Sequence, residues 1–218
     1  SGDWIVIAPK RAKRPEQFIR KEKRIKTPIK GCLFENPQKS GNSQPILIYR
    51  SQKLKVKGQG LNSWLVQVIP NKYPVFVHKD ICPAIMKNGP YSAIEGIGHH
   101  NLVITRDHHK NFPLLDKKSA VLVFKAFQER YRTLIKDSCS AYVSIFHNWG
   151  PKAGASIYHP HYQIISIPVI PPDINHSLSG SADYFRKFKK CVHCVMIEWE
   201  KIQKKKTWNW LLRRCKKL

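Results

Sequence analysis

The sequence predicts an α+β protein in which one long helix covers one side of a mainly antiparallel sheet. Two observations lead to this class. Short apolar runs bounded by Pro, Gly and Asn recur along residues 1–170, and only one long stretch there has clear helical periodicity. Strands that follow one another without an intervening helix favour antiparallel pairing, so a layer of strands with a single helical cover is expected.

Seven segments are predicted to be strands because β-branched, aliphatic and aromatic residues dominate them. In chain order they are Trp4–Ala8, Pro45–Tyr49, Trp64–Ile69, Val75–His78, Asn101–Thr105, Ala141–Phe146 and Tyr158–Ile167.

The predicted helix runs from Asp116 to Asp137, with Asp116 capping its first turn. Apolar residues recur in it at steps of four, three, four and three, which predicts a core-facing stripe. The stripe consists of Ala120, Phe124, Phe127, Tyr131 and Leu134.

Composition limits the classes of protein. A chain of 218 residues suffices for one domain with a sizeable core, or for one domain and part of another. The net charge of +25 favours a polyanionic partner or a solvated basic surface. We expect a solvated surface that steers phosphates, with no specific nucleic-acid partner, because no nucleic-acid-binding module is recognisable. No run of about 18 apolar residues predicts a membrane span, and a cytoplasmic location is expected.

Six cysteines in such a chain suggest thiols or metal ligands before disulfides. Cys82 and Cys139 are interpreted as structural. Cys191 and Cys194 have the spacing of half a zinc site, but no second ligand pair follows them. They come after a Pro-, Ser- and Gly-containing stretch, residues 168–180, that is predicted to be a linker.

The main chemical motif lies between Phe146 and Ile167. His159, His161 and Gln163 occupy alternate residues, so they share one face if this stretch is a strand. A loop with Gly150 and Gly154 precedes them, and small residues let backbone N–H groups approach an anion. The pattern predicts a nucleophile beside a phosphate-binding loop.

A metal site is predicted from three separate regions. Cys32 and Glu35 have a turn-compatible spacing, either His108 or His109 follows a predicted strand, and His159 lies in the main motif. Cys32, Glu35, His108 and His159 would together supply the four ligands of a tetrahedral zinc. A closed site of this kind would be structural, holding the strand that carries His161.

His161 is the predicted nucleophile, because a neutral imidazole can attack phosphorus and later leave it. Gln163 could donate a hydrogen bond to a phosphate oxygen. The alternative is that His159 and His161 are both structural. Further phosphate contacts are expected from the preceding loop and from a basic loop near the N-terminus, namely Asn148, Gly154, Ser156, Arg11 and Arg14. Asn71 and Tyr73 follow a predicted strand, where a ligand-contacting loop and an ordinary turn are both possible, and His99 and His100 have no assignable partner.

The segment Asn148…Gly154-x-Ser156-x-x-His159-Pro160-His161-x-Gln163 resembles the active-site signature of the galactose-1-phosphate uridylyltransferases, a branch of the histidine-triad superfamily. The resemblance extends over nearly all of residues 1–170, including Pro70-Asn71-Lys72-Tyr73-Pro74 and Asp107-His108. It implies a histidine-triad-like nucleotidyltransferase domain in residues 1–175, followed in residues 176–218 by a linker and the truncated start of a second similar domain.

The resemblance also implies a ping-pong reaction. His161 would take a uridylyl group from a UDP-hexose, release hexose-1-phosphate and pass the nucleotide to a second sugar phosphate, with homodimerisation possible. Zinc would be held by Cys32, His108 and His159. Residues near the nucleoside would be Phe34, Asn71, Lys72 and Tyr73, and residues near the phosphates would be Asn148, Gly154, Ser156, Gln163, Arg11 and Arg14.

Two departures from the family leave alternatives open. The family often has Cys-x-x-Cys where this chain has Cys32 and Glu35, although a carboxylate can replace a thiolate. The resemblance also implies a truncated second half, and the family residues that select the sugar would lie there. An adenine-nucleotide phosphorylase or adenylyltransferase, or a catalytically deficient nucleotide-binding remnant, therefore competes with the uridylyltransferase interpretation, while a basic RNA-binding protein ranks last.

Overall fold

A computed structural model describes residues 4–8, 27–50 and 64–203, which divide into two compact units. The first comprises residues 5–169, and the second contains residues 170–203 together with Trp4. We describe each unit separately. The predicted domain boundary after residue 175 stays a prediction.

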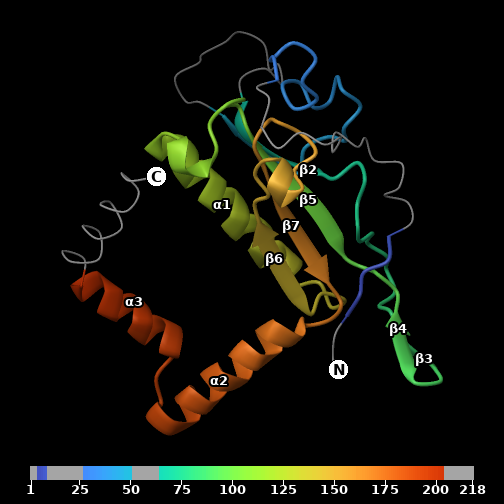
Figure 1. The fold of residues 1–218 in the computed structure, drawn as a ribbon, viewed down its shortest axis with the longest axis vertical. Coiled ribbons are helices and arrows are strands. Elements are labelled where there is room, and N and C mark those ends of the chain that lie inside the picture. The colour runs from blue at the N-terminus through green and yellow to red at the C-terminus, as the bar shows by residue number, and fades with distance from the viewer. Residues whose placement is uncertain (1–3, 9–26, 51–63, 204–218) are drawn as a thin grey trace. The chain divides into compact units, whose positions relative to one another are not determined.

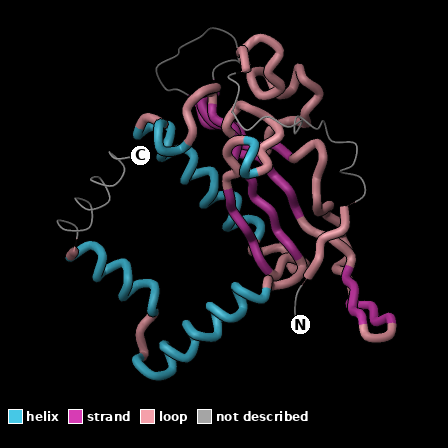
Figure 2. Tube along the Cα trace, in the orientation of Figure 1, coloured by secondary structure: helices cyan, strands magenta, loops and turns pink. Residues whose placement is uncertain are grey.

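The first unit contains a five-stranded sheet in which every neighbouring pair is antiparallel. Its strand order is β1-β2-β5-β7-β6, so β5 is central (Figures 1 and 2). The bounds are β1 Leu47–Arg50, β2 Trp64–Pro70, β5 His99–Thr105, β6 Tyr142–Phe146 and β7 His161–Ile167. A separate hairpin pairs β3, Ile85–Asn88, with β4, Tyr91–Ile94. Two short 3₁₀ turns, Phe112–Leu114 and Pro151–Ala153, lie in the connections.

One long helix, α1, runs from Lys117 to Leu134 and packs against β2, β5, β6 and β7 (Figure 1). As predicted, Asp116 is its N-cap and accepts a hydrogen bond from the Ser119 N–H. The fold class is therefore confirmed: a mostly antiparallel sheet with one covering helix.

Two predicted strands were wrong. Trp4–Ala8 has no regular structure, and Val75–His78 contributes only an isolated bridge between Val77 and Ile97. Both segments are rich in β-branched residues, but they lack the continuous pairing with a neighbour that makes a strand. The other five correspond to strands of the sheet, with starts shifted by at most three residues.

The predicted core stripe of α1 was wrong for Phe124 and Tyr131, whereas Leu134 is buried and Phe127 is partly buried against the core. The buried residues are Val123, Ala126, Arg130 and Leu134, whereas Phe124 is 58% and Tyr131 is 42% exposed. Val123 and Ala126 are small and bring the helix close to the sheet. Phe124 packs edge-to-face on Phe112 at the margin of the contact.

Cys82 and Cys139 form a disulfide, so the expectation of thiols or metal ligands before disulfides was wrong for this pair. The bond links the segment that precedes β3 to the turn that follows α1. Spacing along the chain gave no sign of it, since 57 residues separate the two cysteines.

The second unit is helical, and the prediction of a linker over residues 168–180 was wrong for the part that begins α2. Helix α2 spans Pro172–Phe188 and α3 spans Val192–Ile202. Pro172 occupies the first turn of α2, where its missing N–H costs nothing, so it starts the helix instead of preventing it. Neither helix contains a buried residue. None of the helices in the described part of the chain combines the length and the apolarity needed to cross a membrane.

Candidate active site

The two faces of the sheet carry different residues because side chains alternate along each strand. Val66, Val103, Tyr162 and Ile164 pack in one cluster with buried residues of α1, among them Val123. A second cluster contains Leu102 and Ile104, which alternate with Val103 on β5. Trp64 and Ile69 of β2 and Phe34 of the loop before β1 complete it. His161 and Gln163 alternate with Tyr162 and Ile164 on β7, so they belong to the face opposite α1.

His161 is the first residue of β7 and is buried. Its Nδ1 lies 3.0 Å from the backbone carbonyl oxygen of His159, which can only accept, so Nδ1 carries the proton. In the neutral ring the nitrogen with the lone pair is then Nε2. Phe34 contacts the ring edge-to-face, with the centroids 5.1 Å apart, and limits its rotation. His161 thus has the tautomer of a nucleophile that reacts through Nε2.

Gln163 is oriented by His100, a buried residue of β5. The Val75 N–H donates to Nδ1 of His100 at 3.1 Å, so the proton of the neutral ring is on Nε2. Nε2 then donates to Oε1 of Gln163 at 2.9 Å. This bond holds the oxygen of the Gln163 amide at His100, so the amino group is on the side of the amide away from His100. The Asn71 amide nitrogen also lies 3.0 Å from this Nε2, a contact between two donors in that tautomer. Because the Val75 N–H occupies the lone pair of Nδ1, the oxygen of Gln163 is the partner that Nε2 can donate to.

A cavity of about 400 Å³ lies over this face of the sheet, a size typical of sites for small molecules. It brings together all the described residues predicted to act as nucleophile or to bind substrate, from β7 and three loops. They are Phe34, Asn71, Lys72, Tyr73, Asn148, Gly154, Ser156, His161 and Gln163. The predicted Arg11 and Arg14 lie outside the described residues.

The loop before β7 has the backbone that its glycines predict. Gly150 and Gly154 both have left-handed φ values, +81° and +73°, which other residues rarely adopt. The Gly150 carbonyl accepts hydrogen bonds from the N–H groups of Ala153 and Ala155, closing the loop into a compact turn. Its last residues, Gly154 to Ile157, line the cavity next to His161.

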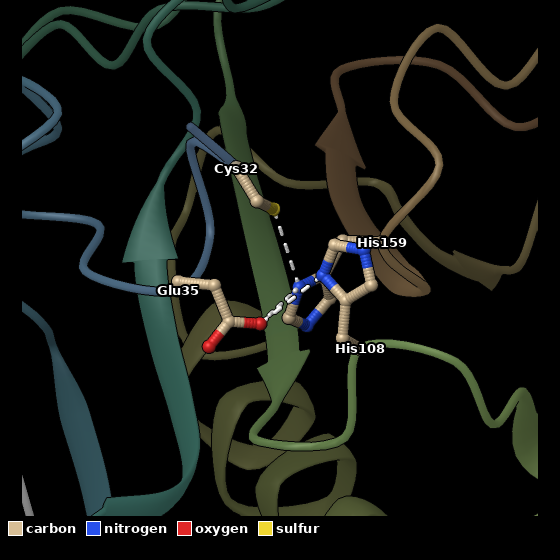
Figure 3. A group of neighbouring side chains, drawn as sticks. All are labelled: Cys32, Glu35, His108 and His159. Carbon is tan, nitrogen blue, oxygen red and sulfur yellow. Dashed lines mark hydrogen bonds and ion pairs between the residues drawn. The ribbon is translucent and has the colours of Figure 1, made fainter. Parts of the chain in front are cut away.

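Four potential metal ligands converge in one cluster (Figure 3). Cys32 and Glu35 come from the loop before β1, His108 follows β5, and His159 precedes β7. Nδ1 of His159 lies 3.5 Å from both Cys32 Sγ and Glu35 Oε1, and Nδ1 of His108 lies 3.1 Å from the same Glu35 oxygen. The structure therefore brings the four predicted ligands into one cluster.

The hydrogen bonds of the two histidines fit a metal ion. Nε2 of His159 donates to the Thr105 carbonyl at 2.8 Å, and Nε2 of His108 donates to the Thr27 carbonyl at 2.9 Å. Both Nδ1 atoms consequently direct lone pairs at the cluster. Such carbonyl-bound histidines are usual around metals, because the outer bond selects the tautomer of the ligand.

A cation would also satisfy the electrostatics of the cluster. Burial lowers the pKa of His159 to about 4, so this ring is neutral near pH 7. Burial raises the pKa of the Cys32 thiol, although N–H groups of Phe34 and Glu35 oppose the rise. With the His108 proton on Nε2, its Nδ1 and the Glu35 carboxylate are two acceptors 3.1 Å apart without a donor between them. The donor set of one sulfur, one carboxylate and two imidazoles suits Zn²⁺.

The structure also decides between the adjacent histidines. His108 is buried and belongs to the cluster, whereas His109 is exposed. Strand β5 ends at Thr105, and the following turn is held by Asp107, whose Oδ1 accepts from the N–H groups of His109 and Lys110. This turn presents His108 to the interior.

Sequence reasoning missed several residues of the cavity and its support. His100 was named from the sequence but was assigned no partner. Gln163 pairs with Leu102, and His100 lies two residues before Leu102 on the same strand. This diagonal neighbourhood is the signal that could have linked His100 to Gln163. The loop residues 33–42 carry no sequence motif that predicts contact with a ligand, apart from the spacing of Glu35 from Cys32. The cavity wall also includes Leu33, Ser40, Asn42, Leu102, Phe146, Ala155 and Ile157.

The fold is similar to those of a uridylyltransferase and of an ADP-glucose phosphorylase. A solved structure described as a uridylyltransferase aligns with 90% of this chain and 53% of its own, at a TM-score of 0.59 and 25% identity. A structure of an ADP-glucose phosphorylase from Arabidopsis thaliana with bound ADP-glucose aligns with 84% of this chain and 51% of its own, at a TM-score of 0.56 and 25% identity.

Sequence comparisons identify the family. Residues 66–171 match the family model described as galactose-1-phosphate uridyl transferase, N-terminal domain. The chain belongs to the galactose-1-phosphate uridylyltransferase family, as the motif around His161 predicted. Among its curated relatives, an ADP-glucose phosphorylase of Arabidopsis thaliana is 30% identical over 88% of this chain and 53% of its own length. A galactose-1-phosphate uridylyltransferase of Thermotoga maritima is 31% identical over 62% of this chain and 43% of its own length.

The chain spans about half the length of the curated relatives it matches. The matched half contains the cavity, His161 and the four-ligand cluster. Activity, substrates and partners of the whole relatives are therefore a matter of proposal for this chain.

Proposed function

We propose that the chain carries the nucleotidyl-transfer half of a hexose-1-phosphate uridylyltransferase, which moves UMP from a UDP-hexose to a hexose-1-phosphate through His161. The observation that supports this most is the tautomer of His161. Because Nδ1 donates to the His159 carbonyl, the lone pair of the neutral ring is on Nε2, at the wall of a cavity of nucleotide size.

In the first step the lone pair on Nε2 of His161 attacks the phosphorus of the uridylyl group. The bond between this phosphorus and the oxygen of the departing hexose-1-phosphate breaks, and the oxygen keeps the bonding electrons. In the second step a phosphate oxygen of the incoming hexose-1-phosphate attacks the same phosphorus, and the P–N bond breaks. The His159 carbonyl, which accepts from Nδ1, stabilises the positive charge that the ring carries in the intermediate.

The cavity residues act on the charge of the phosphate. The amino group of Gln163, whose orientation His100 sets, donates to a phosphate oxygen. Ser156 and the backbone of Gly154 donate from the loop, and Lys72 and Asn71 border the nucleoside. In the four-ligand cluster a zinc ion would hold His159 in place, and hence the carbonyl that binds His161. That ion is structural in this proposal.

A second candidate is an adenine-nucleotide phosphorylase or adenylyltransferase with the same covalent step. It is favoured by one observation, the ADP-glucose phosphorylase relative that aligns with 88% of this chain. The two candidates differ in the nucleobase of the donor and in the acceptor, a hexose-1-phosphate or inorganic phosphate.

The decisive experiment labels the protein with donors radioactive in the phosphate next to the nucleoside. Zinc-loaded, folded chain is incubated with UDP-glucose or ADP-glucose and tested for label that is labile to acid and stable to base, as expected for phosphorus bound to histidine. We expect label from UDP-glucose that is absent in His161→Ala and retained in His109→Ala. Discharge by galactose-1-phosphate supports the transferase, and discharge by inorganic phosphate supports the phosphorylase.

Two results would overturn the proposal. Label that persists in His161→Ala removes the nucleophile. Binding of a nucleotide sugar without label, in a sample that contains its metal, identifies the chain as a nucleotide-binding remnant.

A further inference from the structure

A second cluster of potential ligands lies at the other end of β5 from the four-ligand site. It consists of His78, His99 and Asp137. His99 is the first residue of β5, Asp137 lies in the turn after α1, and His78 follows the bridge of Val77 with Ile97. Since His99 and Thr105 are six residues apart in one strand, roughly 20 Å separates the two ends.

One oxygen of Asp137 is the meeting point of the cluster. Oδ2 lies 2.9 Å from Nε2 of His99 and 3.3 Å from Nδ1 of His78. The other oxygen, Oδ1, accepts from the N–H of Cys139 at 2.9 Å, which fixes the direction of the carboxylate. That N–H is the main cause of the lowered pKa of Asp137, with His99 adding to it, so the group is ionised near neutral pH.

Three features of the fold hold the segments of the cluster together. The disulfide joins Cys82, four residues after His78, to Cys139, two residues after Asp137. The His99 N–H donates to Ser166 Oγ at 2.9 Å. Gly98 allows this approach, because a Cβ there would lie 2.1 Å from the Ser166 carbonyl oxygen. The backbone contacts and the disulfide therefore bring the three side chains together without a bound ligand.

We propose that His78, His99 and Asp137 form a second metal site, which binds a divalent first-row transition metal ion such as Zn²⁺. Two imidazole nitrogens and one carboxylate are the donors that Zn²⁺, Co²⁺ and Ni²⁺ accept, whereas Mg²⁺ and Ca²⁺ prefer oxygen alone. Three protein ligands leave a coordination position for water. The site does not depend on the proposed transfer reaction.

Binding requires one adjustment of the side chains. The rings of His78 and His99 are stacked, 16° from parallel with centroids 4.5 Å apart, and an ion lies in the plane of each imidazole that binds it. One ring must therefore turn. The side chain of His78 is 46% exposed and has room to do so. Each neutral ring also moves its proton to its other nitrogen, so binding to the neutral form needs no net loss of protons.

The site would clamp the same segments as the disulfide. His78 and Cys82 belong to the stretch before β3, while Asp137 and Cys139 belong to the turn after α1. The metal adds His99, and thus the central strand, to this connection. Where the disulfide is reduced, the ion remains a link between the two segments.

The test measures zinc uptake by the full chain. Metal-free protein is dialysed at a free Zn²⁺ concentration set by a competing chelator, and bound zinc is determined by elemental analysis. We expect His78→Ala, His99→Ala and Asp137→Asn each to bind one ion fewer than wild type. His176→Ala, which removes an exposed histidine of α2, is the matched control and should bind as many as wild type. Any zinc bound by Cys191 and Cys194 is present in wild type and variants alike, so it does not affect the difference in bound zinc between them.

Cobalt distinguishes the two clusters. The ion lost in His78→Ala should carry no thiolate-to-cobalt absorption, whereas the ion lost in His108→Ala should carry it, because only that cluster contains Cys32. Circular dichroism checks that each variant is folded. If variants at the less exposed His99 or Asp137 do not fold, the zinc uptake of His78→Ala decides the test. Zinc uptake by folded His78→Ala equal to that of wild type, or an equal loss in His176→Ala, would overturn the proposal.

Discussion

His159 binds His161 through its backbone and faces the four-ligand cluster with its side chain. The carbonyl oxygen of His159 accepts from Nδ1 of His161 at 3.0 Å, and Nδ1 of His159 lies 3.5 Å from Cys32 Sγ. The four-ligand cluster and the hydrogen bond that sets the tautomer of His161 are thus connected through His159. Pro160, between them, stiffens the connection.

This relationship predicts that metal and nucleophile can be separated by mutation. We expect His161→Ala to bind metal as wild type does and to lose covalent labelling. His108→Ala should lose the metal and label more slowly by about tenfold or more, because a shift of His159 misplaces the nucleophile. Elemental analysis and labelling rates on the same samples measure both effects. Loss of zinc in folded His161→Ala would contradict the separation.

His100 is expected to act as a positioning residue through Gln163. Removing the donor itself, in Gln163→Ala, should lower the rate of labelling by about 10²-fold. His100→Ala leaves the amide of Gln163 able to turn over, and the loss of one hydrogen bond predicts a decrease of up to about tenfold.

The double variant His100→Ala/Gln163→Ala tests whether His100 acts through Gln163. If His100 acts through Gln163, the double variant labels no more slowly than Gln163→Ala alone. Single-turnover rates at saturating donor provide the measurement, and independent, multiplicative effects would show that His100 acts by another route.

Glu35 is expected to limit metal affinity and to be replaceable by thiolate. Glu35→Ala removes a direct ligand and should weaken zinc binding by more than the about 10- to 100-fold that loss of an outer partner costs. Glu35→Cys creates the Cys-x-x-Cys spacing and should bind zinc at least as tightly as wild type. In the cobalt form it should show stronger thiolate absorption. An unchanged absorption would mean that position 35 does not reach the ion.

Asp116 should stabilise the protein as the cap of α1. Its carboxylate accepts from the hydroxyl of Ser119 at 2.6 Å and from the Ser119 N–H at 3.0 Å, and these bonds lower its pKa. Asp116→Ala should decrease the free energy of unfolding by about 1 kcal/mol at pH 7, while Asp116→Asn, which also caps, should cost less.

The sign of the pH dependence follows from the lowered pKa. The stabilisation by the charged cap is present above the ordinary pKa of aspartate and is lost as pH falls through the lower folded value. The difference between wild type and Asp116→Ala in urea unfolding should therefore shrink below about pH 4. A difference that is constant down to that range would show that the charge does not contribute.

The sequence by itself determined the fold class, the cap of α1 and the candidate residues of the site. These signals are local: alternation within Tyr158–Ile167, the glycines of the preceding loop, and the spacing of Cys32 and Glu35. Alternation predicted that His161 and Gln163 share a face, because backbone periodicity decides which face a side chain joins. Phe34 and Lys72, which also line the cavity, were expected only from the resemblance to the family.

Tertiary structure alone decided the features that depend on packing between distant segments. It selected His108 over His109, buried Val123 and Ala126 of α1 where larger aromatic residues had been expected, and paired Cys82 with Cys139. It also brought His100 to Gln163, and His78 to Asp137. These contacts join segments that are far apart along the chain, and hydrophobic periodicity within one segment does not predict its partner. The register of β5 against its neighbours and the turn after α1 determine which residues meet.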